Sequence, residues 1–524
     1  MKSETFSISK YIPVLLLVTF LSFFAHLGNL PLFDADEGTY SEVTREMLVN
    51  NDFTLALLND KPFFHKPPLF FWAQAASIKI LGLNEFGLRL PSAIAALLWA
   101  ASIFLFTRRF FDTRSAWYAT LFMASSFFVT IVGRAATPEA MINLFLTLTL
   151  LNIYRFYHTC NKRYIYWAFM FAALGVLTKG SIAILIPVAV SFVFFTLKKN
   201  WKVLFQLFFN PVGLIVFGFI VIPWFIAEFM LYGEAFLSDL FLLHKAESYN
   251  YNFIGNSLPY YSYPILLLVG LLPNTGFFIK ALSQIRTLIS DDLIKFMLIW
   301  FLTTILFLPL SQPKSPFALV YGLPPLFIIM ARDTGDFHLS FKLLIWPLML
   351  TAFFCLVPDL APYIMGSINN DFSRIAVAEG LVYFNAYYRI TLGAILLLLT
   401  ALPFINPAPA ATKYAIVGIL FLSMTHFIVL PILGSTLQQP IKSAALLAKN
   451  EKLTVVTWPD HPPSFNLYAE MLTEQHTPES GDIVLTKTAY WGNKMRYETL
   501  YEKHGIILAR VLGMRKDSPV KRIN

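Results

Sequence analysis

Long apolar segments separated by short polar stretches run through the first 434 residues of this chain. About thirteen of them approach the roughly 20 residues that an α-helix needs to cross the ~30 Å hydrocarbon core of a bilayer. These segments lie near residues 11–28, 90–107, 115–132, 138–155, 164–179, 181–197, 203–224, 260–279, 294–310, 316–331, 342–357, 386–405 and 414–434. The pattern predicts an α-helical polytopic membrane domain over residues 1–434.

Composition supports this class. Hydrophobic residues make up 57% of the 524 positions, and 52 of them are Phe. A soluble protein of this length could not cover so much apolar surface, so lipid surrounds most of the chain. The two cysteines, Cys160 and Cys355, lie in separate apolar regions and indicate neither a disulfide framework nor a thiol site. The formal charge of +9 comes from residues that interrupt hydrophobic runs, which argues against a nucleic-acid partner.

The basic residues between the apolar segments predict the orientation. With a cytoplasmic N-terminus, the inside loops hold Arg108, Arg109, Arg114, Arg155, Lys162, Arg163, Lys198, Lys199, Lys202, Lys280, Arg286, Lys295, Arg332, Lys342 and Lys413. The outer turns hold few cations, as the positive-inside rule requires. This places the loops 29–89 and 225–259 on the outer face. We expect a multi-pass protein of the bacterial inner membrane, with an uncleaved anchor at 11–27 and its active site facing the periplasm.

The segment 435–524 differs from the rest of the chain. Strand-like patterns at 453–458, 482–486 and 506–511 alternate with helical patterns at about 440–450 and 465–475. We predict a small soluble α/β domain in the periplasm. It contains no catalytic spacing, so we interpret it as a lid or packing module.

The first outer loop is the most unusual stretch. Its residues from Phe33 onward include five carboxylates within fourteen positions, in a chain with 14% charged residues. These carboxylates are Asp34, Asp36, Glu37, Glu42 and Glu46. A solvated loop explains the charge, but not the many apolar and aromatic residues beside it.

Further charged residues are predicted to reach the same outer face. They are His65, Lys66, Arg134, Glu139, Lys179, His244 and Lys314. A charged side chain at membrane depth costs about 2.5–3.5 kcal/mol even on lenient scales, so such residues are usually functional. A single lysine can extend harmlessly to the interface, but a whole set on one face is harder to explain that way.

The residue types indicate several roles. Cationic groups can bind a phosphate, which makes candidates of Lys66, Lys179, Arg134 and Lys314. Asp36 and Glu139 can act as a general base or hold a cation. One acid of the Asp36–Glu37 pair is expected to cap the helix that begins near Tyr40, and we interpret Glu37 and Tyr40 as supporting residues.

Two histidines allow two interpretations, one of which is a metal site. His65 and His244 are candidate ligands of a divalent metal, and two imidazoles favour zinc or another borderline metal over magnesium. Two unconnected interfacial histidines explain the sequence equally well. No nucleotide cofactor is expected.

These motifs resemble a known family. The run Asp-Glu-x-x-Tyr-x-Glu-x-x-Arg-Glu-Met at 36–47 and the run Lys-Pro-Pro-x-x-x-Trp at 66–72 are similar to those of bacterial membrane glycosyltransferases of the GT-C superfamily. These enzymes are related to aminoarabinose-to-lipid-A transferase and protein O-mannosyltransferase (glycosyltransferase family 83). Thr178-Lys179-Gly180, Pro223-Trp224, His244 and Lys314-x-Pro316 extend the resemblance over about residues 10–330.

The resemblance implies a fold and a reaction. It implies a GT-C fold, a polyprenyl-phosphate-linked sugar as donor, and inversion at the anomeric carbon. Asp36 falls on the family's base, and Lys66 and Lys179 fall on its phosphate-binding lysines. His65 replaces the acid that usually precedes the first lysine, and Glu139 stands where Asp is usual.

We therefore predict a membrane glycosyltransferase that moves a hexosyl or pentosyl group to an acceptor on the periplasmic face. The expected partners are the lipid-linked donor, membrane lipids and an acceptor that is lipid A, another glycan or a protein. A lipid or polysaccharide transporter explains the helices and cations equally well, but not the acid-rich first loop, and no inverted repeat of broken helices is evident. A structural subunit needs no clustered charges.

Overall fold

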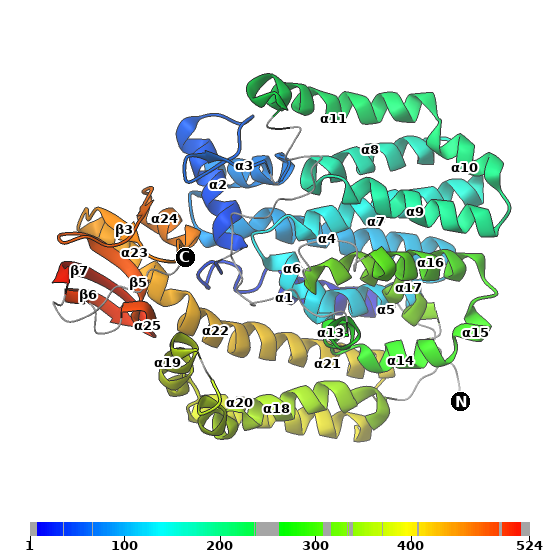
Figure 1. Ribbon diagram of the computed structural model, residues 1–524. Coiled ribbons are helices and arrows are strands. Elements are labelled where there is room, and N and C mark those ends of the chain that lie inside the picture. Colours follow the sequence, from blue (N-terminus) through cyan, green and yellow to red (C-terminus); the bar gives the residue numbers. More distant parts are fainter. Residues whose placement is uncertain are drawn as a thin grey trace.

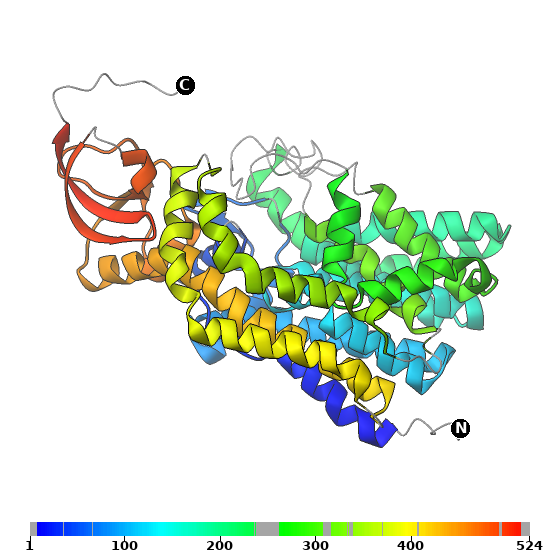
Figure 2. The same ribbon diagram turned by 90° about the horizontal axis from the view of Figure 1, so that it is seen from below.

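The computed structural model of the protein describes residues 8–34, 36–64, 66–234, 236, 261–307, 316–332, 334, 339–368, 370–405, 408–491 and 495–514. A large helical bundle occupies most of the chain, and a small α/β domain lies at one end of it (Figures 1 and 2).

The bundle begins with α1 and continues from α4 to α22. Its first half contains α1 (Ile8–Phe23), α4 (Glu85–Phe110), α5 (Thr113–Ser125), α6 (Phe127–Arg134), α7 (Glu139–Thr159), α8 (Arg163–Lys179), α9 (Ile182–Leu197), α10 (Trp201–Phe208) and α11 (Pro211–Tyr232). Its second half contains α13 (Ser262–Gly270), α14 (Thr275–Ser283), α15 (Ile285–Leu288), α16 (Asp292–Phe307), η2 (Pro316–Gly322), α17 (Leu323–Arg332), α18 (Phe341–Met365), α19 (Asp371–Gly380), α20 (Ala386–Ala401), α21 (Ala410–Met424) and α22 (Leu430–Leu437). Each apolar segment expected from the sequence overlaps one helix or consecutive helices, although the first helix ends at Phe23, short of the predicted residue 28.

Not every helix is long enough to span a bilayer by itself. Among the described residues, six helical stretches are long and apolar enough to cross a membrane, or up to eight if each of two bent pairs is one span. The bent pairs are α5–α6, at 67°, and α13–α14, at 113°. Four further apolar helices have 10–17 residues. The architecture is therefore that of a polytopic α-helical membrane protein.

The break between α5 and α6 has a visible cause. The hydroxyl of Ser126 donates to the carbonyl of Gly270 at 2.7 Å, and the N–H of Phe127 donates to the carbonyl of Leu272 at 2.9 Å. These bonds to the α13–α14 region satisfy groups that a straight helix would use internally. The bend is consequently part of the tertiary packing.

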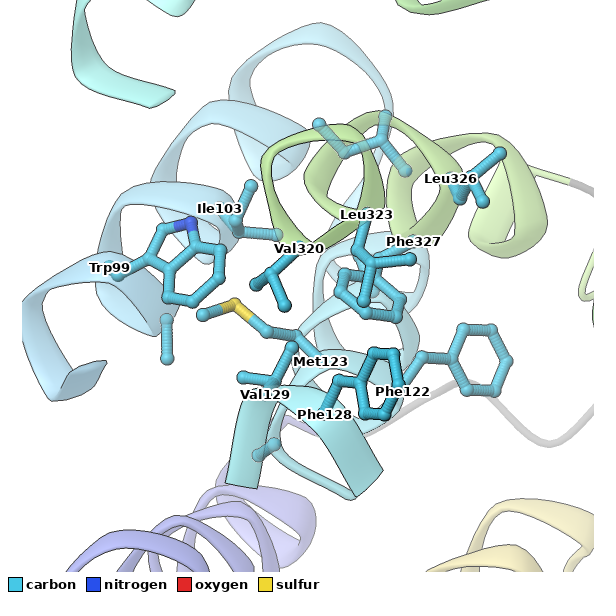
Figure 3. Packing of buried hydrophobic residues seen from close by; sticks show 14 of the residues in the cluster. Trp99, Ile103, Phe122, Met123, Phe128, Val129, Val320, Leu323, Leu326 and Phe327 are labelled. Carbon is cyan, nitrogen blue, oxygen red and sulfur yellow. The ribbon is translucent and has the colours of Figure 1, made fainter. Parts of the chain in front are cut away.

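The bundle core lies where α4, α5, α6, η2 and α17 meet. Figure 3 shows this packing, with Trp99, Ile103, Phe122, Met123, Phe128, Val129, Val320, Leu323, Leu326 and Phe327 labelled. These side chains interdigitate, and each is at most 6% exposed. In lipid, such close packing rather than water exclusion holds helices together.

The first outer loop is itself structured. It contains α2 (Glu37–Asn50), a short antiparallel hairpin of β1 (Leu57–Leu58) and β2 (Lys61–Pro62), and α3 (Leu69–Leu81). The apolar spacing from Tyr40 to Leu48 predicted α2, and the structure confirms that helix. Ten of its fourteen residues are buried, so it lies within the protein rather than in solvent.

The C-terminal domain is a mixed sheet with helices beside it. It comprises α23 (Gln439–Asn450), β3 (Val455–Thr457), α24 (Pro463–Ala469), β4 (Glu474–Gln475), β5 (Ile483–Lys487), α25 (Thr488–Trp491), β6 (Met495–Lys503) and β7 (Ile506–Met514). The strand order is β4-β3-β5-β7-β6, with β3 parallel to both neighbours and β7 antiparallel to both of its own. Its helix α24 packs against α2 (Figure 1).

Candidate functional site

Helix termini bring the candidate residues together at the end of the bundle nearest the C-terminal domain. Asp36 immediately precedes α2, and Lys66 precedes α3. Glu139 is the first residue of α7, whereas Lys179 is the last residue of α8. The charges of Lys66, Glu139 and Lys179 all act on Asp36. Four sequence-predicted residues therefore form one cluster.

Glu139 is the central acceptor of this cluster. The ammonium of Lys179 donates to its Oε1, and the hydroxyl of Tyr321 in η2 donates to its Oε2 at 3.0 Å. The Lys179 Nζ also lies 5.6 Å from the centre of the Tyr321 ring. These contacts fix the lysine at the helix C-terminus, where a cation is also favoured by the helix dipole.

Asp36 is available for chemistry. It occupies the N-cap position of α2, yet its side chain makes no capping hydrogen bond and is solvent-exposed. The expected cap is therefore not formed by Asp36, and it is not formed by Glu37 either, because that carboxylate bonds to Arg89 and to the N–H groups of Phe33 and Ala136. Partial desolvation by the surrounding protein raises its pKa, the Glu139 carboxylate raises it further, and Lys179 and Lys66 oppose the shift.

Lys66 is the less constrained of the two lysines. Burial of its ammonium, together with the nearby Lys179 charge, lowers its pKa to about 8. Within the described ranges Lys66 forms no ion pair. It lines a small cavity together with Thr54, Ala56, Phe63, Phe64, Pro68, Trp224, Glu228 and Phe236. A positive charge in a mostly apolar recess is suited to an anion attached to a lipid.

Glu37 points away from the cluster. It forms an ion pair with Arg89 on α4, and it accepts hydrogen bonds from the N–H groups of Phe33 and Ala136 at 3.0 and 2.7 Å. Both charged partners are buried. Burial alone would raise the pKa of Glu37, but Arg89 and the two N–H groups hold it below its ordinary value. Glu37 thus connects the first loop to the bundle.

Of the remaining candidates, Arg134 lies outside the cluster, whereas Tyr40 lies beside it, where the charges of Asp36, Lys179 and Glu139 act on it. Arg134 at the end of α6 is buried beside the Glu37–Arg89 pair and donates to the carbonyl of Ala25 at 2.6 Å. Tyr40 packs against Phe70 and Phe71, and its hydroxyl lies in the electrostatic field of Asp36.

Three further predicted residues, His65, His244 and Lys314, lie outside the described residues. In the part of the chain that the structure describes, no group of three His, Cys, Asp or Glu side chains could hold a metal ion.

Two residues of the site escaped sequence reasoning. Tyr321 lies in an apolar segment with no spacing that marks it as polar and functional. Arg89 stands at the edge of a predicted span and gives no sign of a partner 52 positions away. Both act through contacts between distant segments.

The chain is similar to known membrane glycosyltransferases in sequence. The profile of the family described as dolichyl-phosphate-mannose-protein mannosyltransferase matches residues 65–226. The undecaprenyl phosphate-α-4-amino-4-deoxy-L-arabinose arabinosyl transferase 2 of Pseudomonas fluorescens is 27% identical over 336 residues, which cover 62% of this chain and 60% of that protein. The corresponding transferase 2 of Proteus mirabilis is 26% identical, covering 64% and 61%. The chain thus matches about three fifths of the length of these relatives.

The fold agrees with a solved structure. The crystal structure of ArnT from Cupriavidus metallidurans bound to undecaprenyl phosphate superposes with a TM-score of 0.78, at 18% identity, over 96% of this chain and 97% of that chain. This likeness confirms the fold expected from the sequence motifs. The chain has the GT-C fold of ArnT, and in sequence it resembles the bacterial aminoarabinose transferases and the protein mannosyltransferases.

Proposed function

We propose that this protein is an integral membrane glycosyltransferase that moves a sugar from a polyprenyl-phosphate donor to an acceptor at the periplasmic face of the inner membrane. The observation that carries the proposal is the position of Asp36, an exposed carboxylate in the field of Lys66 and Lys179. A proton acceptor beside a cationic phosphate site is what such a reaction requires.

The two lysines have different tasks in donor binding. Lys66 forms no ion pair among the described residues, so its ammonium is available to the phosphate, although it lies in the fields of Glu139 and Asp36. Lys179 is already paired with Glu139, so it adds a fixed, partly neutralised charge behind the site. Arg134 is not part of this phosphate site, because it donates to Ala25 instead.

The reaction proceeds as a direct displacement. An acceptor hydroxyl attacks the anomeric carbon while a carboxylate oxygen of Asp36 takes its proton. The bond between the anomeric carbon and the phosphate oxygen breaks, and its electron pair leaves with polyprenyl phosphate. A positioned general base typically contributes about 10²–10⁴-fold in rate. The raised pKa of Asp36 makes it a stronger base. The lysines stabilise the departing phosphate.

The names of the relatives suggest the first donor to test. Two of them are named for 4-amino-4-deoxy-L-arabinose on undecaprenyl phosphate. We propose an undecaprenyl-phosphate aminopentose as donor and lipid A as the first acceptor, with other envelope glycans and proteins as the further acceptor classes. The relatives carry transferase names, and no observation favours a transporter.

A reconstituted assay tests the proposal. Purified protein in lipid vesicles should transfer the aminopentose from undecaprenyl phosphate to lipid A, as followed by mass spectrometry. Asp36→Asn preserves the size of the side chain but removes the base. It should therefore bind the donor and fail to transfer the sugar. Transfer at the wild-type rate by Asp36→Asn would overturn the mechanism.

A deletion strain identifies the physiological substrates. Lipid A and surface glycans from this strain and its parent should differ by one sugar mass, which names donor and acceptor together. Identical envelopes in the two strains under conditions where the protein is made would contradict the proposal.

A further inference from the structure

The C-terminal domain contacts the first outer loop two residues before Asp36. The N–H of Ser464, at the start of α24, donates to Oδ1 of Asp34 at 2.9 Å. The hydroxyl of Ser464 donates to Oδ2 of the same carboxylate at 2.7 Å. Ser464 is 1% exposed, so a single buried residue of the C-terminal domain engages both oxygens of Asp34, one through its backbone N–H and the other through its hydroxyl.

Gly38 makes this close approach possible. A Cβ at Gly38 would lie 2.7 Å from Oδ1 of Asp34 and 3.0 Å from the N of Ser464. Glycine inside a helix costs about 1 kcal/mol relative to alanine, so its presence in the first turn of α2 needs a reason. The reason here is space, because any side chain at this position would enter the Asp34–Ser464 contact.

A second contact holds the same segment. The hydroxyl of Tyr468 on α24 accepts a hydrogen bond from the N–H of Leu32 at 2.8 Å and donates to Oε1 of Glu85 at 3.0 Å. The loop around residues 32–34 is therefore attached to α24 at two points. It is attached to the bundle independently, through the Glu37–Arg89 pair.

Asp36 lies between these two anchors. Its own carboxylate makes no capping bond, so the anchored residues Asp34 and Glu37, which lie close to it in the chain, are the contacts that can hold it in place. Arg89 fixes the Glu37 end of this turn, whereas Ser464 fixes the Asp34 end. If the Ser464 contact were lost, α2 would stay attached to the bundle, but the turn would gain freedom at the catalytic residue.

We propose that the C-terminal domain is a positioning module for the active site, and that Ser464, acting through Asp34, sets the position of Asp36. This inference rests on the proposed function, since it assigns a positioning role relative to that base. The lid or packing role expected from the sequence thus becomes a specific one. Ser464 and Asp34 are positioning residues, because neither reaches the reacting atoms.

A positioning role for Ser464 predicts different effects on donor binding and on sugar transfer. Lys66 and Lys179 belong to other elements, so donor binding should not depend on Ser464. The chemical step should, because displacing a catalytic group by about 1 Å can cost about 10²-fold in rate. We therefore expect lower kcat at unchanged affinity for undecaprenyl phosphate.

Four variants test this in the full-length protein. Ser464→Ala removes the hydroxyl bond to Oδ2 of Asp34, and Asp34→Asn removes the carboxylate charge and one of the two acceptor oxygens. Gly38→Ala places a methyl group in the contact without changing any polar group, and Ser464→Thr retains the hydroxyl. The matched control is Glu379→Ala, which removes a 2.7 Å hydrogen bond between α19 and the N–H of His504 in the same domain, away from the loop.

Two measurements are made on each variant. Hydrogen–deuterium exchange should increase across residues 33–38 in the three disrupting variants, and remain as in wild type in Ser464→Thr and Glu379→Ala. In the transfer assay the disrupting variants should lose about 10²-fold in kcat per folded molecule. Binding of undecaprenyl phosphate should be unchanged.

The outcomes are distinguishable. Wild-type exchange and kcat in Ser464→Ala and Gly38→Ala would overturn the inference. A lower melting temperature with unchanged kcat per folded molecule would show that the contact only stabilises the fold. That result would also overturn the inference. A wild-type protein that transfers no sugar would contradict the proposed function, whereas the exchange data would still decide whether Ser464 holds the turn.

Discussion

Glu37 and Arg89 form a buried ion pair between the start of α2 and the start of α4, with 2.7 Å between Oε2 and Nη2. Arg89 also donates to the carbonyls of Leu27, Leu30 and Pro31. One guanidinium therefore joins the end of the first helical segment, the first outer loop and the bundle. The adjacent residues Asp36 and Glu37 have opposite surroundings, one exposed in the cluster and the other buried in this junction.

Glu37→Gln should destabilise the protein. The change leaves the buried charge of Arg89 without its partner, and breaking a buried pair in this way typically costs about 3–5 kcal/mol. The control is Asp371→Asn, since Asp371 and Arg374 are also 2.7 Å apart but exposed, where a pair contributes about 0–1 kcal/mol. Thermal unfolding in detergent measures both. Equal melting temperatures for the two variants would contradict the role of Glu37.

The contribution of the Glu37–Arg89 pair to stability should depend on pH. The pKa of Glu37 is lowered from its ordinary value of 4.5. The stabilisation it provides is therefore present above about pH 4.5 and is lost as the pH falls through the lower folded-state pKa. Wild type should lose more stability on acidification below this value than Glu37→Gln does.

Donor affinity should fall above pH 8. The phosphate favours the protonated form of Lys66, whose pKa is lowered to about 8 by burial and by Lys179. Binding of undecaprenyl phosphate should thus change little between about pH 7 and pH 8, where the phosphate is mostly a dianion, and weaken by about tenfold per unit above pH 8. Lys66→Met should bind weakly at pH 7 and show no such decline. Lys79→Met, which changes an exposed lysine of α3, should behave as wild type.

The hydroxyl of Tyr321 should support transfer through Glu139. A hydrogen bond to a charged group contributes about 1.5–3 kcal/mol, so Tyr321→Phe should lower kcat/KM by at least about tenfold. Tyr157→Phe is the chemical control, because its hydroxyl bonds Asp292 away from the cluster. Equal steady-state kinetics for both variants would remove Tyr321 from the site.

The orientation of the chain can be measured directly. The distribution of Lys and Arg predicts a cytoplasmic N-terminus and a periplasmic C-terminal domain. A reporter that requires the periplasm should be active when fused after Asn524 and inactive when fused after Arg109. The reverse pattern would place the charged cluster on the cytoplasmic side and refute the proposed acceptors.

The metal site remains a sequence-based prediction. If His65 and His244 are ligands, purified protein should contain about one equivalent of zinc, because imidazole nitrogens suit that ion. His65→Ala should contain none. Metal-free wild-type protein with chelator-resistant transfer would end this hypothesis.

Much of the fold could be predicted because hydrophobic length and period are local properties. The apolar segments, α2, and α23, α24, β3, β5 and β7 of the C-terminal domain followed from windows of a few residues. The strands β4 and β6 were not predicted, and the helix expected at about 465–475 was wrong beyond Ala469, because β4 pairs with β3 there. The bend after Ser125 could not be predicted in this way. It depends on bonds from Ser126 and Phe127 to the α13–α14 region, more than 140 positions away.

The site likewise contains residues that the local sequence predicts and residues that only long-range contacts reveal. Asp36, Lys66, Glu139 and Lys179 stood out because an ionisable residue is conspicuous in an apolar chain. Their grouping at one end of the bundle followed from alternating span directions. The partners that define their roles did not, since Tyr321 and Ser464 are ordinary residues whose importance lies in what they contact.

Asp34 and Ser464 are separated by 430 positions, so the active-site loop and its anchor are made at very different times. At a synthesis rate of about 5–20 residues per second, the loop exists for roughly 20–90 s before Ser464 is added. A nascent or truncated chain that ends before α24 therefore carries all four charged residues of the cluster but lacks the Ser464 contact with Asp34. On the proposed role of Ser464, the order of translation delays completion of the site until α24 has been made.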